Sequence, residues 1–243
     1  MSRRRFIADQ VCGGRAVVEG GRAEHLSRVL RARPGQEFEV AAGGRVRLGR
    51  IVQVEQRRVE FELGAEVAVK VLAPVTLYLA VFKFDRMEWA LEKCTELGAE
   101  RIVPLICSRT GAGLAAAAEK RAARWRRLMA QAAEQSRRAA PPELADPLRL
   151  NHETLAARGS AGARVVLAES ECALRLRDAL DECRAQAGDG SFPVALATGP
   201  EGGWTGAERE LFAQCGWTSA SLGPTILRAE TAAIAALAIV QNL

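Results

Sequence analysis

Short apolar runs, some of them alternating with polar residues, recur along the first 70 residues of the chain and predict β-strands. The predicted strands cover residues 38–41, 45–54 and 58–63. Turn signals separate them at Pro34-Gly35 and Gly43-Gly44, because proline and glycine favour the backbone angles of tight turns. This part of the chain is therefore expected to be rich in short strands.

One predicted helix, residues 23–31, interrupts these strands. The apolar positions that share one of its faces are Leu26, Val29 and Leu30. Its polar positions include His25, Arg28 and Arg31. The pattern indicates a small β-barrel that carries a basic helix, and residues 64–74 look like the crossing into a second domain.

From residue 75 onward, strand-like and helix-like segments alternate. The predicted strands are residues 75–82, 101–107, 164–169, 194–198 and 219–222. The predicted helices are residues 85–97, opened by capping-box spacing at Asp85–Glu88 and stopped by Gly98, then 114–140, 172–186, 207–214 and 229–242. Such alternation predicts an α/β fold with a parallel sheet covered by helices, in which ligands bind at the carboxyl ends of the strands.

Charge is distributed unevenly between these two parts. The first 70 residues carry 14 basic and 9 acidic side chains, whereas residues 71–243 carry 20 of each. Because phosphate contacts favour Lys and Arg, the excess favours a polyanionic partner such as nucleic acid for the first part. The alternative is a compositional bias, since 30 of the 34 basic residues are arginine.

Composition excludes several classes of protein. With 49% hydrophobic and 26% charged residues, the 243-residue chain fits a soluble globular protein and not a disordered one. The first ten residues, MSRRRFIADQ, lack the apolar core of a signal peptide, and no run approaches the roughly 20 apolar residues of a membrane span. Six scattered cysteines without a CxxC pair, together with two distant histidines, predict buried reduced thiols and no metal site. We therefore expect a cytoplasmic protein without a membrane partner.

The clearest local motif is ATGPEGGWTGAE at residues 197–208. A predicted strand runs into a loop with three glycines and a proline, and Thr205 and Glu208 have the spacing of a capping box at the start of the next helix. Glycines let a ligand approach the backbone, and free amides can bind an adenine or carboxylate edge. The alternative is a tight strand-to-helix turn without a ligand. Because the loop is neither GxGxxG nor a Walker loop, nucleotide hydrolysis has little support.

A second glycine-proline loop, SLGPTILRAET at residues 221–231, follows one helix and one strand later. It brings Arg228, Glu230 and Thr231 to the start of an apolar helix. Arg228 can also be an ordinary surface charge, and Glu230 can simply complement the helix dipole. Because the two loops end successive strands, we expect them to line one crevice.

Two further polar sets lie at the ends of predicted elements. Ser108-Arg109-Thr110 directly follows a strand, so we expect it at the same sheet edge as the two loops. The sequence EQSRR at residues 134–138 ends an alanine-rich helix that also carries Lys120, Arg121 and Arg124. A solvated basic face is the alternative for this helix.

Taken together, these motifs resemble one family. GPEGGW, LGP-ILRAETA, EQSRR, MEWALEKCTELGAERIVPLICSRT and HLSRVLRARPGQ are similar to segments of the bacterial ribosomal RNA small-subunit methyltransferase E family, in the SPOUT class. The resemblance covers essentially the whole chain, from about residue 5 to residue 243. Two positions depart from the family pattern: Thr198 replaces an aliphatic residue, and Thr225 replaces an arginine.

The resemblance implies a fold, a cofactor and partners. It implies a PUA-like RNA-binding β-barrel over residues 1–72 and a SPOUT methyltransferase domain with a trefoil knot over residues 73–243. It also implies a homodimer that uses S-adenosyl-L-methionine, without a metal, to methylate N3 of a uridine in 16S ribosomal RNA, either naked or in the small ribosomal subunit. A uracil anion formed during this reaction requires a cation nearby.

These considerations assign three groups of site residues. The candidate catalytic residues are Arg109 and Arg228 as cations near the uracil anion, and Glu230 as a base. The candidate cofactor-binding residues are Ala197, Thr198, Gly199, Pro200, Glu201, Gly202, Gly203, Leu222, Gly223, Pro224, Ile226, Leu227 and Arg228. The candidate RNA-binding residues are Arg3, Arg4, Arg5, His25, Arg28, Arg31, Gln135, Arg137 and Arg138.

Two rival functions remain open at this point. The protein can be a ribosome-assembly factor that binds RNA without transferring a methyl group, although such a binder would not need both glycine-proline loops. It can also methylate another RNA such as tRNA, because a basic amino-terminal domain suits any RNA.

Overall fold

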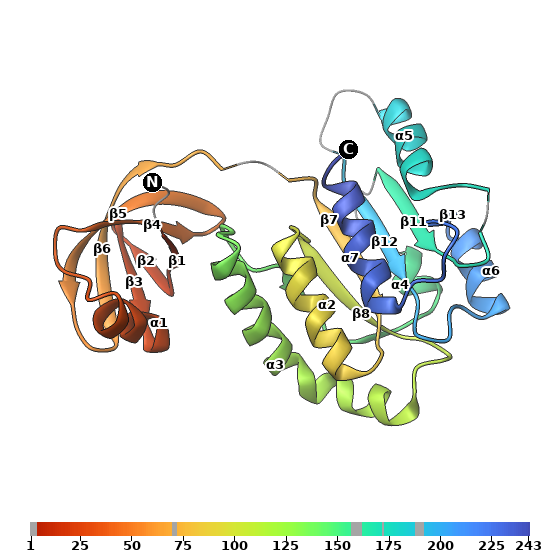
Figure 1. Cartoon of the computed structure of the whole chain (residues 1–243), viewed down its shortest axis with the longest axis horizontal. Coiled ribbons are helices and arrows are strands. Elements are labelled where there is room, and N and C mark those ends of the chain that lie inside the picture. Colours follow the sequence, from red (N-terminus) through yellow and green to blue (C-terminus); the bar gives the residue numbers. More distant parts are fainter. Residues whose placement is uncertain (1–3, 70–71, 157–161, 172, 188–191) are drawn as a thin grey trace. The chain divides into compact units, whose positions relative to one another are not determined.

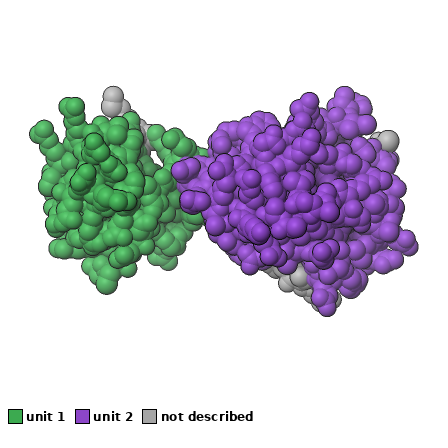
Figure 2. Space-filling view, turned by 90° about the horizontal axis from the view of Figure 1, so that it is seen from below, with its two compact units in different colours: residues 1–71, 133–141 green, residues 72–132, 142–243 purple. Residues whose placement is uncertain are grey.

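The computed structural model describes residues 4–69, 72–156, 162–171, 173–187 and 192–243 (Figure 1). The chain divides into two compact units, coloured separately in Figure 2. Unit 1 contains residues 1–71 and 133–141, and unit 2 contains residues 72–132 and 142–243.

Unit 1 is built on a six-stranded sheet with the order β1-β4-β5-β6-β3-β2. The strands are β1 (Arg5–Ile7), β2 (Gln10–Cys12), β3 (Arg15–Glu19), β4 (Glu37–Ala42), β5 (Arg45–Val54) and β6 (Arg58–Glu66). β1 and β4 are parallel, and the other neighbours are antiparallel. Phe38 makes edge-on ring contacts with Phe6 and Phe61 across this core. The three longer strands confirm the sequence prediction, whereas β1, β2 and β3 were not predicted.

The predicted helix over residues 23–31 is only partly correct. The chain forms α1 (Gly20–Glu24) and then η1 (His25–Val29), a π-helical turn in which Leu30 N–H donates to the His25 carbonyl at 2.9 Å. Because a π-turn holds more residues than an α-turn, Val29 rotates out of the expected apolar face and is 66% exposed. Arg31 ends the segment with a positive φ of 50°.

Unit 2 is built on a seven-stranded sheet with the main order β10-β8-β7-β12-β11-β13 and β9 beside β8. Its strands are β7 (Val75–Ala80), β8 (Arg101–Ile106), β9 (Glu143–Leu144), β10 (Leu148–Arg149), β11 (Ala163–Leu167), β12 (Val194–Thr198) and β13 (Thr218–Ala220). All of its pairings are parallel, which confirms the predicted α/β fold. In addition, β9 and β10 were not predicted.

Helices cover both faces of this sheet. They are α2 (Phe84–Glu96), α3 (Ala112–Gln135), α4 (His152–Ala156), α5 (Leu176–Ala187), α6 (Gly206–Gln214) and α7 (Ala229–Val240) (Figure 1). Leu196 of β12 packs into the core formed with α2, α3, α5 and α7, whereas its neighbours Ala195 and Ala197 face the core formed with α4 and α6. This alternation along a strand buried on both faces explains why β12 reads as a continuous apolar run.

Several predicted helix ends need correction. The capping box predicted at Asp85–Glu88 is wrong, because Lys83 precedes α2 without a side-chain cap and Glu88 instead binds Arg124 of α3 at 2.8 Å. Helix α3 ends at Gln135 and not at residue 140, and α5 begins at Leu176, while Cys172 lies outside the described residues. The stop at Gly98 is confirmed by its φ of 99° and its N–H bond to the Thr95 carbonyl.

The cysteines are free thiols wherever the structure describes them, but only two of them are buried. Burial raises the pKa of Cys94 and of Cys107 to about 12, so both are protonated at neutral pH. The expectation of buried thiols is wrong for Cys12, which is exposed, and for Cys183 and Cys215, which are half-buried. Within the described parts of the chain, no helix combines the length and apolar character needed to cross a bilayer.

Candidate functional site

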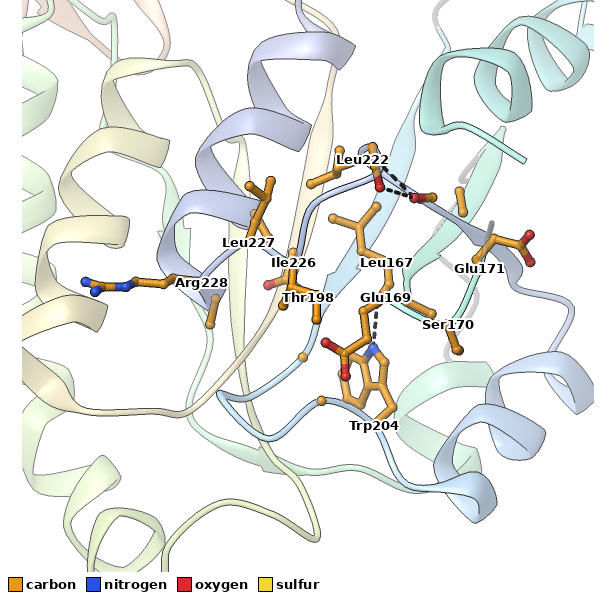
Figure 3. Close-up of a pocket in the computed structure, with 18 of the residues that line it drawn as sticks. Leu167, Glu169, Ser170, Glu171, Thr198, Trp204, Leu222, Ile226, Leu227 and Arg228 are labelled. Carbon is orange, nitrogen blue, oxygen red and sulfur yellow. Dashed lines mark hydrogen bonds between the residues drawn. The ribbon is translucent and has the colours of Figure 1, made fainter. Parts of the chain in front are cut away.

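A pocket of about 880 Å³ lies at the carboxyl ends of β11, β12 and β13 in unit 2 (Figure 3). Its walls come from residues 167–171 at the end of β11, residues 198–201 and 203–204 at the end of β12, and residues 220–229 at the end of β13. Both glycine-proline loops therefore line one crevice, as the sequence predicts. Four arginines from other segments complete the wall: Arg86, Arg109, Arg175 and Arg209.

Two glycines of the loop after β12 lie close to neighbouring side chains, and one of them has a backbone conformation that favours glycine. A Cβ on Gly203 would lie 2.9 Å from Glu169 Oε1, and the φ of this residue is 68°. A Cβ on Gly199 would lie 3.1 Å from the Trp204 ring. Trp204 in turn fastens the loop to β11, because its Nε1–H donates to the Leu167 carbonyl at 2.8 Å (Figure 3).

The predicted capping box at the start of α6 is confirmed, and its carboxylate has an additional partner. Glu208 Oε2 accepts the Thr205 N–H at 2.8 Å, while Glu208 Oε1 accepts the Ser108 N–H at 2.8 Å. Burial by itself would raise the pKa of Glu208, but the hydrogen bonds from Thr205 and Ser108 outweigh it and hold the pKa below its ordinary value. One carboxylate thus joins the loop after β8 to the loop after β12.

The loop after β13 runs parallel to the segment that leads into α5, with Ser221 paired to Arg175. Ser221 N–H donates to the Leu174 carbonyl and Leu176 N–H donates to the Ser221 carbonyl, both at 2.9 Å. Ser221 Oγ also contacts Gly223 at 3.1 and 3.2 Å, which shapes the turn beside the pocket. Further along, Ile226 is 79% exposed at the pocket mouth.

The three candidate catalytic residues occupy different positions around the pocket. Arg109 lines it and donates to the Gly202 carbonyl. Arg228 is the exposed residue that precedes α7, and Figure 3 shows its side chain extending away from Thr198 and Trp204. Glu230, in the first turn of α7, is only 4% exposed and lies outside the pocket lining.

Most of the candidate cofactor-binding residues line the pocket. These are Thr198, Gly199, Pro200, Glu201, Gly203, Leu222, Gly223, Pro224, Ile226, Leu227 and Arg228. Ala197 is instead buried in the core within β12, and Gly202 stands outside the lining. Sequence reasoning did not include Arg86, Arg175 or residues 167–171, which carry no glycine-rich motif.

The candidate RNA-binding residues lie in unit 1, apart from Arg3, which falls outside the described residues. Arg5 is held by Glu39 at 2.8 Å and donates to the Arg137 carbonyl. Arg28 pairs with Glu24 at 2.7 Å on the helix surface. The other exposed members of the set are Arg4, His25, Arg31, Gln135 and Arg137, while Arg138 is half-buried.

Part of the EQSRR segment, residues 134–138, contacts α1 and β1 of unit 1. Arg22 pairs with Glu134 at 2.7 Å and also binds Asp9. Because Arg5 reaches the Arg137 carbonyl as well, residues 133–141 belong to unit 1 although they are far from it in sequence.

Comparison with known proteins identifies the family of this chain. A family model described as an RNA methyltransferase domain matches residues 70–241. The chain is 32% identical over 239 residues to the ribosomal RNA small subunit methyltransferase E of Synechocystis, covering 97% of this chain and 75% of that protein. It is 35% identical over 241 residues to the protein of the same name from Mycobacterium tuberculosis, covering 94% and 86%.

Two solved structures share the fold over nearly the whole chain. The ribosomal RNA small subunit methyltransferase E of Neisseria gonorrhoeae, bound to S-adenosyl methionine, is 28% identical with a TM-score of 0.81 and covers 99% of this chain and 97% of its own. A Legionella pneumophila methyltransferase in complex with the same cofactor is 25% identical with a TM-score of 0.78, covering 100% and 98%. The chain therefore belongs to the ribosomal RNA small subunit methyltransferase E family.

Proposed function

We propose that this protein uses S-adenosylmethionine to methylate N3 of a uridine in 16S ribosomal RNA of the small ribosomal subunit. The observation that carries the proposal is the pocket that both glycine-proline loops build at the carboxyl ends of β11, β12 and β13. The relative from Neisseria gonorrhoeae that holds this cofactor has the same fold. Its name refers to small-subunit ribosomal RNA, and the choice of uridine N3 follows from the family resemblance described above.

The residues of the pocket fit this cofactor. A volume of about 880 Å³ is in the usual range for a ligand of its size. Thr198 belongs to the pocket wall, and its buried Oγ1 has no hydrogen-bond partner among the described residues. Gly199 and Gly203 keep the backbone open to close approach. When bound, the cofactor supplies an electrophilic methyl group.

The surrounding residues supply the remaining requirements of methyl transfer. Uracil N3–H is weakly acidic, so the protein must accept its proton and stabilise the resulting anion. Glu230 of the first turn of α7 is the proposed acceptor: its Oε2 has no hydrogen-bond partner among the described residues, although the side chain is buried behind the pocket lining. Arg109 and Arg228 are the proposed cations, since a guanidinium remains charged throughout the working pH range.

Residues 1–72, which make up most of unit 1, are the proposed PUA-like RNA-binding barrel, and residues 73–243 are the proposed methyltransferase domain. The support for RNA binding is the charge of the first 70 residues, with 14 basic and 9 acidic side chains. Exposed residues such as Arg4, His25 and Arg31 are suitable phosphate contacts. The ion pair of Arg5 with Glu39 makes Arg5 less available for that role.

A trefoil knot is the proposed topology of unit 2. Such knots are rare exceptions to the general rules of chain connection. The support is the family resemblance, together with the position of the loop after β13, which pairs in parallel with the segment before α5 through Ser221 and Arg175.

A cytoplasmic homodimer is the proposed working form. Leu237 and Val240 of α7 are buried within unit 2, so they do not offer an apolar surface to a second copy. Ile234 is only partly buried, and Trp89 of α2 is 48% exposed. Sedimentation at low micromolar concentration is expected to show a species of twice 26.1 kDa, and a single species of 26.1 kDa would contradict the dimer.

A reconstituted reaction tests the proposed function. Purified protein and S-adenosylmethionine are incubated with small ribosomal subunits, or with naked 16S RNA, from a strain that lacks the protein. Nucleoside mass spectrometry is expected to detect 3-methyluridine only when both protein and cofactor are present. Binding of RNA without methylation, or methylation of tRNA alone, would overturn the proposal.

A further inference from the structure

Arg86 lies outside both glycine-proline loops, yet its guanidinium reaches residues that follow each of the two strands β12 and β13. It is in the first turn of α2 and lines the pocket. Its Nη1 donates to Glu201 Oε1 at 3.3 Å, in the loop after β12. Its Nε lies 3.8 Å from Glu230 Oε1, in the first turn of α7. One side chain therefore connects three elements around the pocket.

The pairing with Glu230 is the more consequential of the two contacts. The Glu230 side chain is 6% exposed, whereas those of Arg86 and Glu201 are 35% and 39% exposed. A carboxylate this deeply buried is costly unless a cation or hydrogen-bond donors compensate it. Backbone amides at the start of α7 help, but Glu230 Oε2 still finds no hydrogen-bond partner among the described residues.

We propose that Arg86 is a positioning residue that fixes the loop after β12 against the start of α7 through its contacts with Glu201 and Glu230. This inference rests on the proposed function, because both of the segments that Arg86 connects line the proposed cofactor pocket. Arg86 acts through Glu201 and Glu230 and does not itself contact the reacting atoms. Since two carboxylates neutralise its charge, it is poorly suited to stabilise the uracil anion directly.

Two substitutions separate this role from simple loss of charge. Arg86→Gln removes both contacts and is expected to weaken S-adenosylmethionine binding and slow single-turnover methylation, each by about tenfold, which is within the range of coupling between neighbouring residues. Arg86→Lys is expected to recover part of both losses, because an ammonium supplies charge but cannot span two carboxylates as a guanidinium does. Arg101→Gln is the matched control, since Arg101 pairs with Glu143 at 3.3 Å at the opposite ends of the strands.

A double-mutant cycle with Glu230→Gln tests the buried pair. Glu230→Gln in the Arg86→Gln background removes the carboxylate that the first substitution leaves without its cation. The combined loss of cofactor affinity is therefore expected to be smaller than the product of the two single losses. Losses that simply multiply, or Arg86→Gln affinity and rate equal to wild type, would overturn the proposal.

Amide hydrogen exchange of the free protein provides a readout that does not depend on the enzyme's function. Arg86→Gln is expected to speed exchange in residues 199–205 and 229–232, whereas Arg101→Gln leaves both segments unchanged. Unchanged exchange in Arg86→Gln would overturn the positioning role. If the wild type neither binds the cofactor nor methylates RNA, the proposed function is rejected. Faster exchange in Arg86→Gln would still support the positioning role in that case.

Discussion

Replacing Glu208 by glutamine tests how firmly the loop after β12 is joined to the loop after β8. Glu208 is 6% exposed, and its two oxygens accept N–H groups of Ser108 and Thr205, each at 2.8 Å. A glutamine offers one acceptor oxygen and turns an NH2 group toward the second N–H donor, which is left without a partner. Hydrogen bonds to charged groups contribute about 1.5–3 kcal/mol each, so we expect Glu208→Gln to lower the free energy of unfolding of unit 2 by about 2–3 kcal/mol.

Urea unfolding followed by tryptophan fluorescence measures this loss, because all four tryptophans belong to unit 2. Glu210→Gln, an exposed position on the same helix, is the control and is expected to match the wild type within about 0.5 kcal/mol. Thr205→Ala removes the capping hydroxyl but leaves the bond from Ser108, and is expected to cost about 1 kcal/mol. Equal stability of Glu208→Gln and wild type at neutral pH would refute the reasoning.

The same pair of proteins has a predictable pH dependence. The pKa of Glu208 in the folded protein is below its ordinary value, so the unfolded state binds the proton more tightly. The stabilisation by ionised Glu208 is therefore complete above the unfolded pKa of about 4.3 and is lost as pH falls through the lower folded pKa. The difference in stability between wild type and Glu208→Gln must shrink on acidification, and a difference that grows instead would contradict the assigned cause.

Four further substitutions test the pocket and the RNA-binding surface. Gly203→Ala places a Cβ 2.9 Å from Glu169 at a φ of 68°, so calorimetry is expected to show strongly weakened cofactor binding; undiminished affinity would reject this wall of the pocket. Arg109→Ala and Arg228→Ala are each expected to slow single-turnover methylation by about 2.7–4 kcal/mol of transition-state stabilisation, with a smaller change in cofactor affinity; near wild-type rates in both would remove these arginines from the mechanism. Arg31→Gln is expected to lower the salt dependence of RNA binding by about 0.7–0.9 in logarithmic slope, and an unchanged slope would exclude it as a phosphate contact.

The elements that the sequence predicts well are those in which local pattern and tertiary environment agree. β12 was predicted over its full length, because a strand buried on both faces of a parallel sheet is a continuous apolar run bounded by turn residues. The start of α6 was predicted because the Thr205–Glu208 capping box is a local interaction. The same spacing at Asp85–Glu88 gave a wrong prediction of a capping box. Glu88 instead accepts hydrogen bonds from arginines of α3 that are 33 and 36 residues away in the sequence.

The missed parts of the site share a physical cause. Residues 167–171 line the pocket only because β11 lies between β12 and β13, and a sheet order cannot be derived from one strand's own residues. Arg86 was missed because its partners are 115 and 144 positions away and become neighbours only on folding. In unit 1, β1 and β2 have three residues each, too short for any period to be read from the sequence.

Mass spectrometry of 16S ribosomal RNA from a strain lacking this protein tests whether the protein methylates a uridine of that RNA. We expect one uridine to lose its N3 methyl group in that strain, and the wild-type gene to restore it. A gene encoding Gly203→Ala is expected not to restore it, whereas one encoding the Arg101→Gln control is expected to do so. An identical set of N3-methylated uridines in the strain without the protein and in the parent strain would contradict the proposed function.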